Sequence, residues 1–439
     1  MISSDFLEAI AQEHHLSKAE QEVLVLAMQG KPTAAIAAEI GISGDAVRKR
    51  LSEVYQKFQI SGRGPVKLTR LQQLLVSRYQ AEGQSPAVSP PISASGPIKV
   101  QLTQTVPAHH WGEAPDSGVF YGRGTELAQL QQWLLQEQCR LVIVLGMAGI
   151  GKTALAVKLA RQIAAEFEAV IWLSLRQAPV LSTLLEQVAE ILTDSGSHNG
   201  KTPKPLEAQI SDLLDYCRAH RCLLVLDGAE SILQSGRLAG IYREGYEDYG
   251  ELFKRLGQEP HQSSVLITSQ EKPAEISLLE GETSPVRSLT LKGLTAAEAQ
   301  HLLTEKGLSG DTQKWNDLIR GYRGNPFMLK MVATTIREVF DGNVTAFLKT
   351  TLFTHDISDY LEDILARVSD VEAEILRQIV QQQQPLSLDE LMTALPDSSP
   401  QDLIQALQSL KQRSLLETSE GRFNLPPAVL SVVAEEMEA

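Results

Sequence analysis

The stretch GMAGIGKTAL, residues 146–155, constrains the fold of this chain more than any other. It places Gly146, Gly151, Lys152 and Thr153 in the order glycine, four residues, glycine, lysine, threonine. The preceding RLVIVLG is typical of a strand buried on both faces of a parallel sheet, and the following KTALAVKLARQIAAEF is helix-prone. Main-chain N–H groups of such a turn and the positive end of the helix can wrap a polyphosphate. The pattern therefore predicts a phosphate-binding loop between a strand and a helix.

The side chains of this loop and of one later strand predict a site for a nucleotide polyphosphate with Mg²⁺. We expect Lys152 to reach the β- and γ-phosphate oxygens and the Thr153 hydroxyl to ligate Mg²⁺. The apolar run RCLLVLDGAES places Asp227 at the carboxyl end of a strand, where it would hold the same ion directly or through water. The residues expected around the phosphates are Gly146, Gly149, Ile150, Gly151, Lys152, Thr153 and Ala154.

Further patterns predict the rest of the fold. The runs AVIWLSL, SSVLITSQEKP and RSLTLKGL add three buried strands, and strands that alternate with helices form a parallel sheet with helices on both faces. After residue 291 helical patterns dominate. Helical patterns at 370–381, 387–394 and 400–412, followed by two short strands around Gly421, predict a winged helix. We therefore expect a multidomain protein in which an α/β domain is joined to all-α parts.

Charge is unevenly spread along the chain. The net charge of −14 argues against a protein coated with nucleic acid, yet residues 41–80 hold eight basic residues against two acidic ones, a local net charge of +6. The three cysteines show no metal-ligand spacing, the N-terminus resembles no secretory signal, and no apolar run approaches the length of a membrane helix. We expect a cytoplasmic protein that does not engage a membrane.

Six stretches, taken in order, resemble the NB-ARC family of STAND signal-transduction ATPases: FYGR, GMAGIGKTAL, AVIWLSL, LLVLDGAE, VLITSQ and GNPFMLK. The resemblance covers about residues 119–435. It implies a nucleotide-binding domain, a helical domain and a winged helix that close over ADP and open with ATP. It also places Pro326 over the base. A proline at the first position of a helix explains Pro326 equally well and is compatible with that role. The residues that it places beside the adenine and ribose are Phe120, Tyr121, Gly122 and Arg123.

The sequence departs from the family pattern at three places. The family usually carries a second acid after the metal-binding Asp227, whereas this chain has Gly228, with Glu230 the nearest acid. An arginine that senses the γ-phosphate is usual where this chain has Gln270. A Met-His-Asp stretch that contacts ADP is replaced by residues 425–427, Leu-Pro-Pro. We therefore expect Asp227, Glu230 and Gln270 to form a catalytic group with slow or absent hydrolysis.

The first 80 residues resemble a LuxR-type helix-turn-helix. LSKAEQEVLVLAMQG predicts a first helix, and PTAAIAAEI, the turn GIS and GDAVRKRLSEVYQKF follow. Ser43 is a natural N-cap for the last of these helices, whose exposed side would enter a major groove. A helical module that binds protein through a solvated basic face remains the alternative. The residues expected to contact DNA are Ser43, Asp45, Arg48, Lys49 and Lys57.

These observations predict five segments and two candidate functions. Residues 81–118, rich in Pro, Ser and Gly, are expected to form a linker. The leading hypothesis is a nucleotide-switched DNA-binding transcription regulator, and the alternative is a nucleotide-dependent scaffold or signalling adaptor. No repeat array follows the winged helix in this sequence, so we expect a protein partner or the N-terminal unit to supply the signal, with nucleotide-dependent self-association as a further possibility. The segments expected on either side of the linker are 1–80 (helix-turn-helix), 119–291 (nucleotide-binding), 292–355 (helical) and 356–439 (winged helix).

Overall fold

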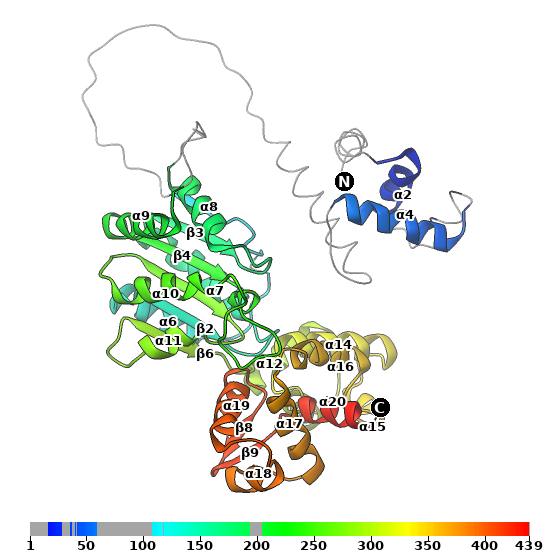
Figure 1. Ribbon diagram of the computed structural model, residues 1–439. Coiled ribbons are helices and arrows are strands. Elements are labelled where there is room, and N and C mark those ends of the chain that lie inside the picture. The colour runs from blue at the N-terminus through cyan, green and yellow to red at the C-terminus, as the bar shows by residue number, and fades with distance from the viewer. Residues whose placement is uncertain are drawn as a thin grey trace, which may run out of the picture. The chain divides into compact units, whose positions relative to one another are not determined.

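The computed structural model describes residues 16–28, 36, 40, 42–58, 108–116, 118–193 and 204–438 (Figure 1). The chain divides into two compact units, Met1–Leu102 and Thr103–Ala439.

The first unit contains two described helices, α2 (Lys18–Met28) and α4 (Gly44–Lys57), which pack against each other. Their contact is an apolar core that includes Val23, Val47 and Leu51. The Ser43 hydroxyl accepts from the Ala46 N–H at 3.2 Å and so caps α4, as the sequence predicts.

The second unit begins with a six-stranded parallel sheet in the order β1-β3-β4-β5-β2-β6. Five of these strands lie in the apolar runs that predicted them, and the expected fold class is confirmed. The sixth, β1, lies at the edge of the sheet within the residues predicted as linker, so the sheet begins earlier in the chain than expected. The strands are β1 (Ala108–His110), β2 (Leu141–Leu145), β3 (Ala169–Ser174), β4 (Cys222–Asp227), β5 (Ser264–Ser269) and β6 (Val286–Thr290).

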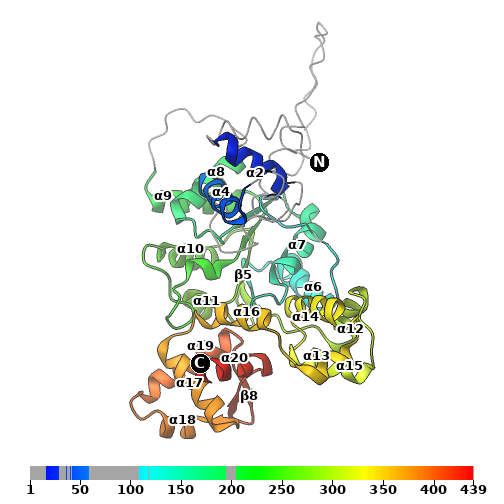
Figure 2. The same ribbon diagram turned by 90° about the vertical axis from the view of Figure 1, so that its right-hand side faces the viewer.

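Helices cover both faces of this sheet (Figures 1 and 2). The alternation of side chains along a strand decides which face each residue serves: Val142 and Val144 join one apolar cluster, while Leu141, Ile143 and Leu145 join the other. The cluster with Val142 holds residues from α6, η1 and α7, and the other holds residues from α8–α11 and η3. The elements are α6 (Gly124–Gln131), η1 (Gln132–Gln136), α7 (Lys152–Ile163), η2 (Ala164–Glu166), α8 (Leu181–Thr193), α9 (Leu206–Ala219), η3 (Ala229–Ile232), α10 (Asp248–Gln258) and α11 (Ala274–Leu279).

Helices dominate after the sheet. Four helices form the helical part: α12 (Ala296–Glu305), α13 (Thr312–Gly321), α14 (Pro326–Val339) and α15 (Val344–Thr350). After α16 (His355–Leu365), three helices and a small antiparallel sheet in the order β7-β9-β8 form the winged helix, and α20 follows it. Its elements are α17 (Asp370–Gln382), β7 (Leu386–Ser387), α18 (Leu388–Ala394), α19 (Pro400–Gln412), β8 (Glu417–Ser419), β9 (Arg422–Asn424) and α20 (Pro427–Glu438).

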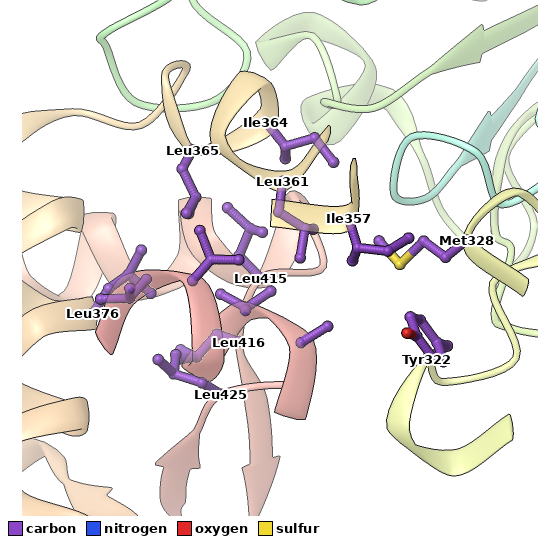
Figure 3. Close-up of a cluster of buried hydrophobic side chains, with 14 of the residues drawn as sticks. Tyr322, Met328, Ile357, Leu361, Ile364, Leu365, Leu376, Leu415, Leu416 and Leu425 are labelled. Atoms are coloured by element: carbon purple, nitrogen blue, oxygen red, sulfur yellow. The ribbon is translucent and has the colours of Figure 1, made fainter. Parts of the chain in front are cut away.

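One apolar core joins the helical part to the winged helix through α16, which contacts both α14 and α20. Figure 3 shows Ile357 and Leu361 of α16 between Met328 on one side and Leu415 on the other. The predicted boundary between residues 355 and 356 falls at the start of α16. Among the described residues, no helix combines the length and the apolar character that crossing a membrane requires.

Candidate nucleotide-binding site

The glycine-rich turn lies between β2 and α7, where the sequence places it. Gly146, Gly149 and Gly151 have φ values of +147°, +71° and +104°, a region that L-residues with side chains rarely adopt. A Cβ atom on Gly149 would lie 2.6 Å from both Phe327 Cβ and the Tyr360 hydroxyl, so the turn is also closely packed. Of the other loop residues, Ile150 is buried and Ala154 is exposed. The loop can therefore keep this shape only with glycine at these positions.

Lys152 is the first residue of α7 and lies inside the loop. Its Nζ donates to the carbonyls of Gly146 (2.8 Å) and Met147 (3.1 Å). Only 8% of the residue is exposed. Burial lowers the pKa of Lys152, while the negative charges of Glu230 and Asp227 oppose that shift. The ammonium thus lies buried inside the loop, and its contact with phosphates stays a prediction.

Asp227, at the end of β4, accepts hydrogen bonds from two threonines. Its Oδ1 accepts from Thr153 Oγ1 at 2.6 Å and from Thr268 Oγ1 at 2.7 Å. The register of β4 on β5 pairs Asp227 with Thr268. In the sheet, β5 lies between β4 and β2, the strand that precedes the glycine-rich loop. The structure therefore brings the two predicted magnesium ligands, Thr153 and Asp227, into contact. These oxygens are of the kind that Mg²⁺ prefers in proteins.

Arg176 is a member of this site that the sequence motifs did not reveal. Its Nε donates to Asp227 Oδ2 at 3.1 Å, and its Nη2 donates to Thr153 Oγ1 at 3.0 Å. The signal that could have found it is its position just past the end of β3, since the carboxyl ends of parallel strands meet at one edge of the sheet.

Glu230 and Gln270, the other predicted catalytic residues, lie together beside this edge. Glu230 accepts from the Gln270 side chain at 3.0 Å and from its main-chain N–H at 3.2 Å. The Gln270 amide therefore has a carboxylate partner within the domain. The roles of both side chains toward a nucleotide stay predictions.

The segment predicted beside the adenine, residues 120–123, links the loop to α12. Arg123 is buried and has a φ of +65°; its Nη2 donates to the Ile150 carbonyl at 3.2 Å, and its N–H donates to Glu298 Oε1 at 3.0 Å. Tyr121 donates its hydroxyl to Glu305. Burial raises the pKa of Tyr121 to about 12, with further contributions from Glu305. In this structure Arg123 therefore contacts the glycine-rich loop through the Ile150 carbonyl.

The GNPF stretch contacts the loop from the helical part. Asn325 Nδ2 donates to the Ala148 carbonyl at 3.0 Å, and the Phe327 N–H donates to the Gly149 carbonyl at 3.3 Å. Asn325 Oδ1 also caps α14 by accepting from the Phe327 and Met328 N–H groups. Pro326 is the first residue of α14 and lies beside these contacts, so the helix-start interpretation holds whatever its role toward a base. Sequence reasoning named Pro326 but missed Asn325, whose cap position before a proline was a usable signal.

The winged helix contacts the nucleotide domain next to Glu230. Glu271 is buried and accepts from Arg367 Nε at 2.7 Å and Arg413 Nη2 at 3.5 Å. Arg413 also meets the fully buried Glu372 at 3.4 Å. Arg367 Nη2 donates to the Glu230 carbonyl at 3.0 Å. At the position of the expected Met-His-Asp stretch, Leu425 is buried in the apolar core instead.

In the first unit, the predicted DNA contacts are only partly described. Ser43 and Lys49 are exposed. Lys57 pairs with Glu20 of α2 at 2.7 Å. Burial alone would raise the pKa of Glu20, but hydrogen bonds from Lys57 and Ser17 outweigh it, and the pKa is lowered. Asp45 and Arg48 belong to α4, but their side chains lie outside the described part of the chain.

Comparison with known proteins identifies two families within the chain. Residues 123–236 match the family described as NB-ARC domain. Residues 14–67 match the family described as bacterial regulatory proteins, luxR family. The first match contains three of the six stretches that resemble the NB-ARC family, GMAGIGKTAL, AVIWLSL and LLVLDGAE, and the second lies within the first 80 residues.

One curated protein and two solved structures give the extent of the likeness. An uncharacterized WD repeat-containing protein of Nostoc sp. is 40% identical over 350 residues, which cover 76% of this chain; the chain spans only 28% of that protein. A STAND protein of Pyrococcus horikoshii with a tetratricopeptide repeat sensor is 18% identical with a TM-score of 0.39, covering 74% of this chain and 43% of that one. A Walker-type ATPase of Pyrococcus abyssi is 17% identical with a TM-score of 0.48, covering 72% and 96% of the respective chains.

Proposed function

We propose that this chain is a P-loop ATPase of the NB-ARC (STAND) type whose bound ADP or ATP switches its binding to DNA through the N-terminal LuxR-type segment; the family matches at residues 123–236 and 14–67 support the proposal. At the coarser level it is a nucleotide-dependent signalling regulator. The proposal adds that the regulated output is transcription and that hydrolysis is slow or absent.

The observation that carries the switch is the contact between the phosphate-binding loop and the helical part. The carbonyls of Ala148 and Gly149 accept hydrogen bonds from Asn325 and Phe327, which begin α14. A change in loop shape on nucleotide binding therefore acts directly on the start of α14. Because α14, α16 and the winged helix share one apolar core, that movement reaches the C-terminal part of the chain.

The site fits a magnesium nucleotide. The loop N–H groups and Lys152 would hold the phosphates, and Thr153 and Asp227 would hold Mg²⁺, which neutralises phosphate charge when it is bound. The protein side chains orient the phosphates and place the cations. Gly228 supplies no acid to orient water, and Gln270 is neutral and engaged by Glu230. These features support slow hydrolysis, since one missing donor typically costs about 10²–10³ in rate.

Three observations support DNA as the output. The luxR-family match covers residues 14–67, Lys49 lies exposed on α4, and residues 41–80 carry a net charge of +6 in a chain of net charge −14. Such a basic segment would attract phosphate locally. The acidic remainder would oppose that attraction whenever it lies close. A nucleotide state that moves the acidic part away, or that brings several chains together, would raise DNA affinity without a new base contact.

The test is a fluorescence-anisotropy titration of the full chain against genomic duplex fragments. It compares ADP with a non-hydrolysable ATP analogue at two salt concentrations. We expect tighter binding in one nucleotide state and weaker binding at high salt. Arg48→Ala with Lys49→Ala should weaken binding, whereas the matched pair Arg218→Ala with Lys254→Ala, on the sheet domain, should not. The mass in each nucleotide state, measured by light scattering, reports any self-association.

A scaffold or signalling adaptor that binds protein instead of DNA is the second candidate. It is favoured by the Lys57–Glu20 pair, which uses one of the predicted DNA contacts inside the unit, and by the acidity of the whole chain. If the full chain binds no duplex in either nucleotide state even at low salt, the adaptor function replaces the regulator function.

A further inference from the structure

Arg176 bridges the two side chains predicted to ligate Mg²⁺. It lies in the turn after β3, where the Leu175 N–H donates to the Asp227 carbonyl at 2.8 Å. This bond fixes the start of the turn beside Asp227. The guanidinium then reaches Thr153 Oγ1 at 3.0 Å and Asp227 Oδ2 at 3.1 Å. A single cation therefore contacts both members of the predicted metal site.

Gly228 provides the space for this arrangement. Its φ is +86°, and a Cβ atom built there would lie 2.9 Å from Arg176 Cγ. A side chain at position 228, such as the second acid that the family resemblance leads one to expect, would meet the stem of Arg176. The departure at Gly228 and the position of Arg176 are thus two parts of one local arrangement.

The charges explain why Arg176 takes this position. Asp227 is almost fully buried, and a buried carboxylate requires a cation or several donors. The Arg176 side chain is 62% exposed, so it can leave the site and enter solvent without disturbing the core. A divalent cation held by Thr153 and Asp227 would sit within a few ångströms of the guanidinium, and like charges at such a separation repel.

We propose that Arg176 is an exchangeable counter-cation of the magnesium site, which it occupies when Mg²⁺ is absent and leaves when Mg²⁺ binds with the nucleotide. The inference rests on the nucleotide binding proposed above. Arg176 is a positioning residue in this role, because its bonds to Asp227 and Thr153 have to break before these side chains bind Mg²⁺, and this changes the free energy of Mg²⁺ binding.

Two effects of removing Arg176 act in the same direction. Without Mg²⁺, Arg176 supplies positive charge close to the phosphates, so its loss weakens binding of metal-free ADP. With Mg²⁺, Arg176 has to give up its bonds to Asp227 and Thr153, and this cost disappears in the variant. The ratio of the ADP dissociation constant in EDTA to that in Mg²⁺ therefore rises when Arg176 is removed.

The experiment titrates the full chain with a fluorescent ADP in EDTA and in excess Mg²⁺. We expect the ratio to rise about tenfold in Arg176→Gln, the size of one lost charge-assisted hydrogen bond. Arg176→Lys keeps the charge but cannot bridge both oxygens, so it should give an intermediate ratio. The control is Arg218→Gln, another partly exposed arginine with acidic partners, at the C-terminal end of α9. Thermal unfolding checks that each variant remains folded.

The outcomes separate the inference from the function on which it rests. A wild-type protein that binds no fluorescent ADP in either buffer overturns the proposed function and the inference together. A wild-type protein that binds ADP, with a ratio unchanged or lowered in both Arg176 variants, overturns the inference alone. Equal weakening in both buffers also overturns it, because it would mean that Arg176 only stabilises the site.

Discussion

Lys152 makes a prediction about a single side chain. Its ammonium is buried and bonded to the Gly146 and Met147 carbonyls, at the place where phosphates would lie. Lys152→Ala should weaken ADP and ATP binding by at least about tenfold, because hydrogen bonds to charged groups contribute about 1.5–3 kcal/mol. The measurement is calorimetric titration, with Lys254→Ala on the surface of α10 as control. Unchanged affinity in a folded variant would contradict the site assignment.

Gln270 gives a second prediction, which the structure changes from what the sequence alone suggests. An arginine at 270 would be expected to restore a missing cation and raise hydrolysis, but Glu230 lies 3.0 Å from the Gln270 amide and would hold the new guanidinium. We therefore expect little change in turnover for Gln270→Arg alone. Combined with Glu230→Gln, which frees the guanidinium but also removes the nearest acid, it should raise turnover by at most about 10²-fold. A phosphate-release assay on both variants checks this, and equal rates in the two would refute it.

The side chains of the site differ in how visible they are from sequence. Gly151, Lys152 and Thr153 are adjacent in one motif, and Asp227 ends an apolar run, so local patterns reveal them. Arg176 reaches Asp227 from the turn after β3, and the hydroxyl of Tyr360 from α16 lies against Gly149, but no motif includes either residue. Their roles depend on side-chain direction in the folded chain, and no local periodicity encodes that direction.

The start of α14 allows a prediction about a helix end. Asn325→Ala removes both the cap of α14 and the bond to the Ala148 carbonyl. Losing a cap costs about 1 kcal/mol, and losing the hydrogen bond to the partly buried Ala148 carbonyl adds about 1 kcal/mol. The control is Asn343→Ala, which removes only the cap of α15. We expect both variants to lose stability in urea, but only Asn325→Ala to weaken ADP binding, by about fivefold. Equal ADP affinity in the two variants would show that the loop contact does not matter.

Apolar runs predict five of the six strands of the large sheet, and helical patterns predict α7 and the three helices of the winged helix. The winged helix follows the predicted pattern closely: α17, α18 and α19 cover Asp370–Gln382, Leu388–Ala394 and Pro400–Gln412. The exception is β1, a three-residue strand with two exposed histidines. It forms because β3 offers an unpaired edge, and that tertiary partner leaves no trace in the sequence of β1.

For the second unit as a whole, the arrangement of the winged helix on the nucleotide domain depends on Glu271. This carboxylate is 1% exposed and contacts Arg367 and Arg413, which follow α16 and α19. The sequence predicted both domains but not this contact, since Arg367 and Arg413 lie 96 and 142 residues after Glu271 along the chain. Removing one member of a buried ion pair is strongly destabilising, by about 3–5 kcal/mol, when the other charge is left without partners.

Glu271→Gln should therefore loosen the winged helix from the nucleotide domain. Arg413 keeps Glu372 and the Arg367 carbonyl as partners, so the loss should fall below that range and leave each domain folded. Two main-chain N–H groups report on the contact directly: Gly236 donates to the Arg367 carbonyl at 3.0 Å and Ala239 to Ser409 Oγ at 2.7 Å. Because amide exchange measures local opening, we expect faster hydrogen–deuterium exchange at both in the variant.

The matched control is Glu374→Gln, which removes an ion pair with Arg377 on the exposed side of α17 and touches no interdomain contact described here. If the nucleotide switch acts through the same contact, the ATP analogue should speed exchange at Gly236 and Ala239 in the wild type, whereas ADP should not. In Glu271→Gln that nucleotide effect should shrink, because the contact is already open. Exchange that is unchanged in the variant while the unfolding temperature falls would place the role of Glu271 in stability alone, and the switch would then have to act elsewhere.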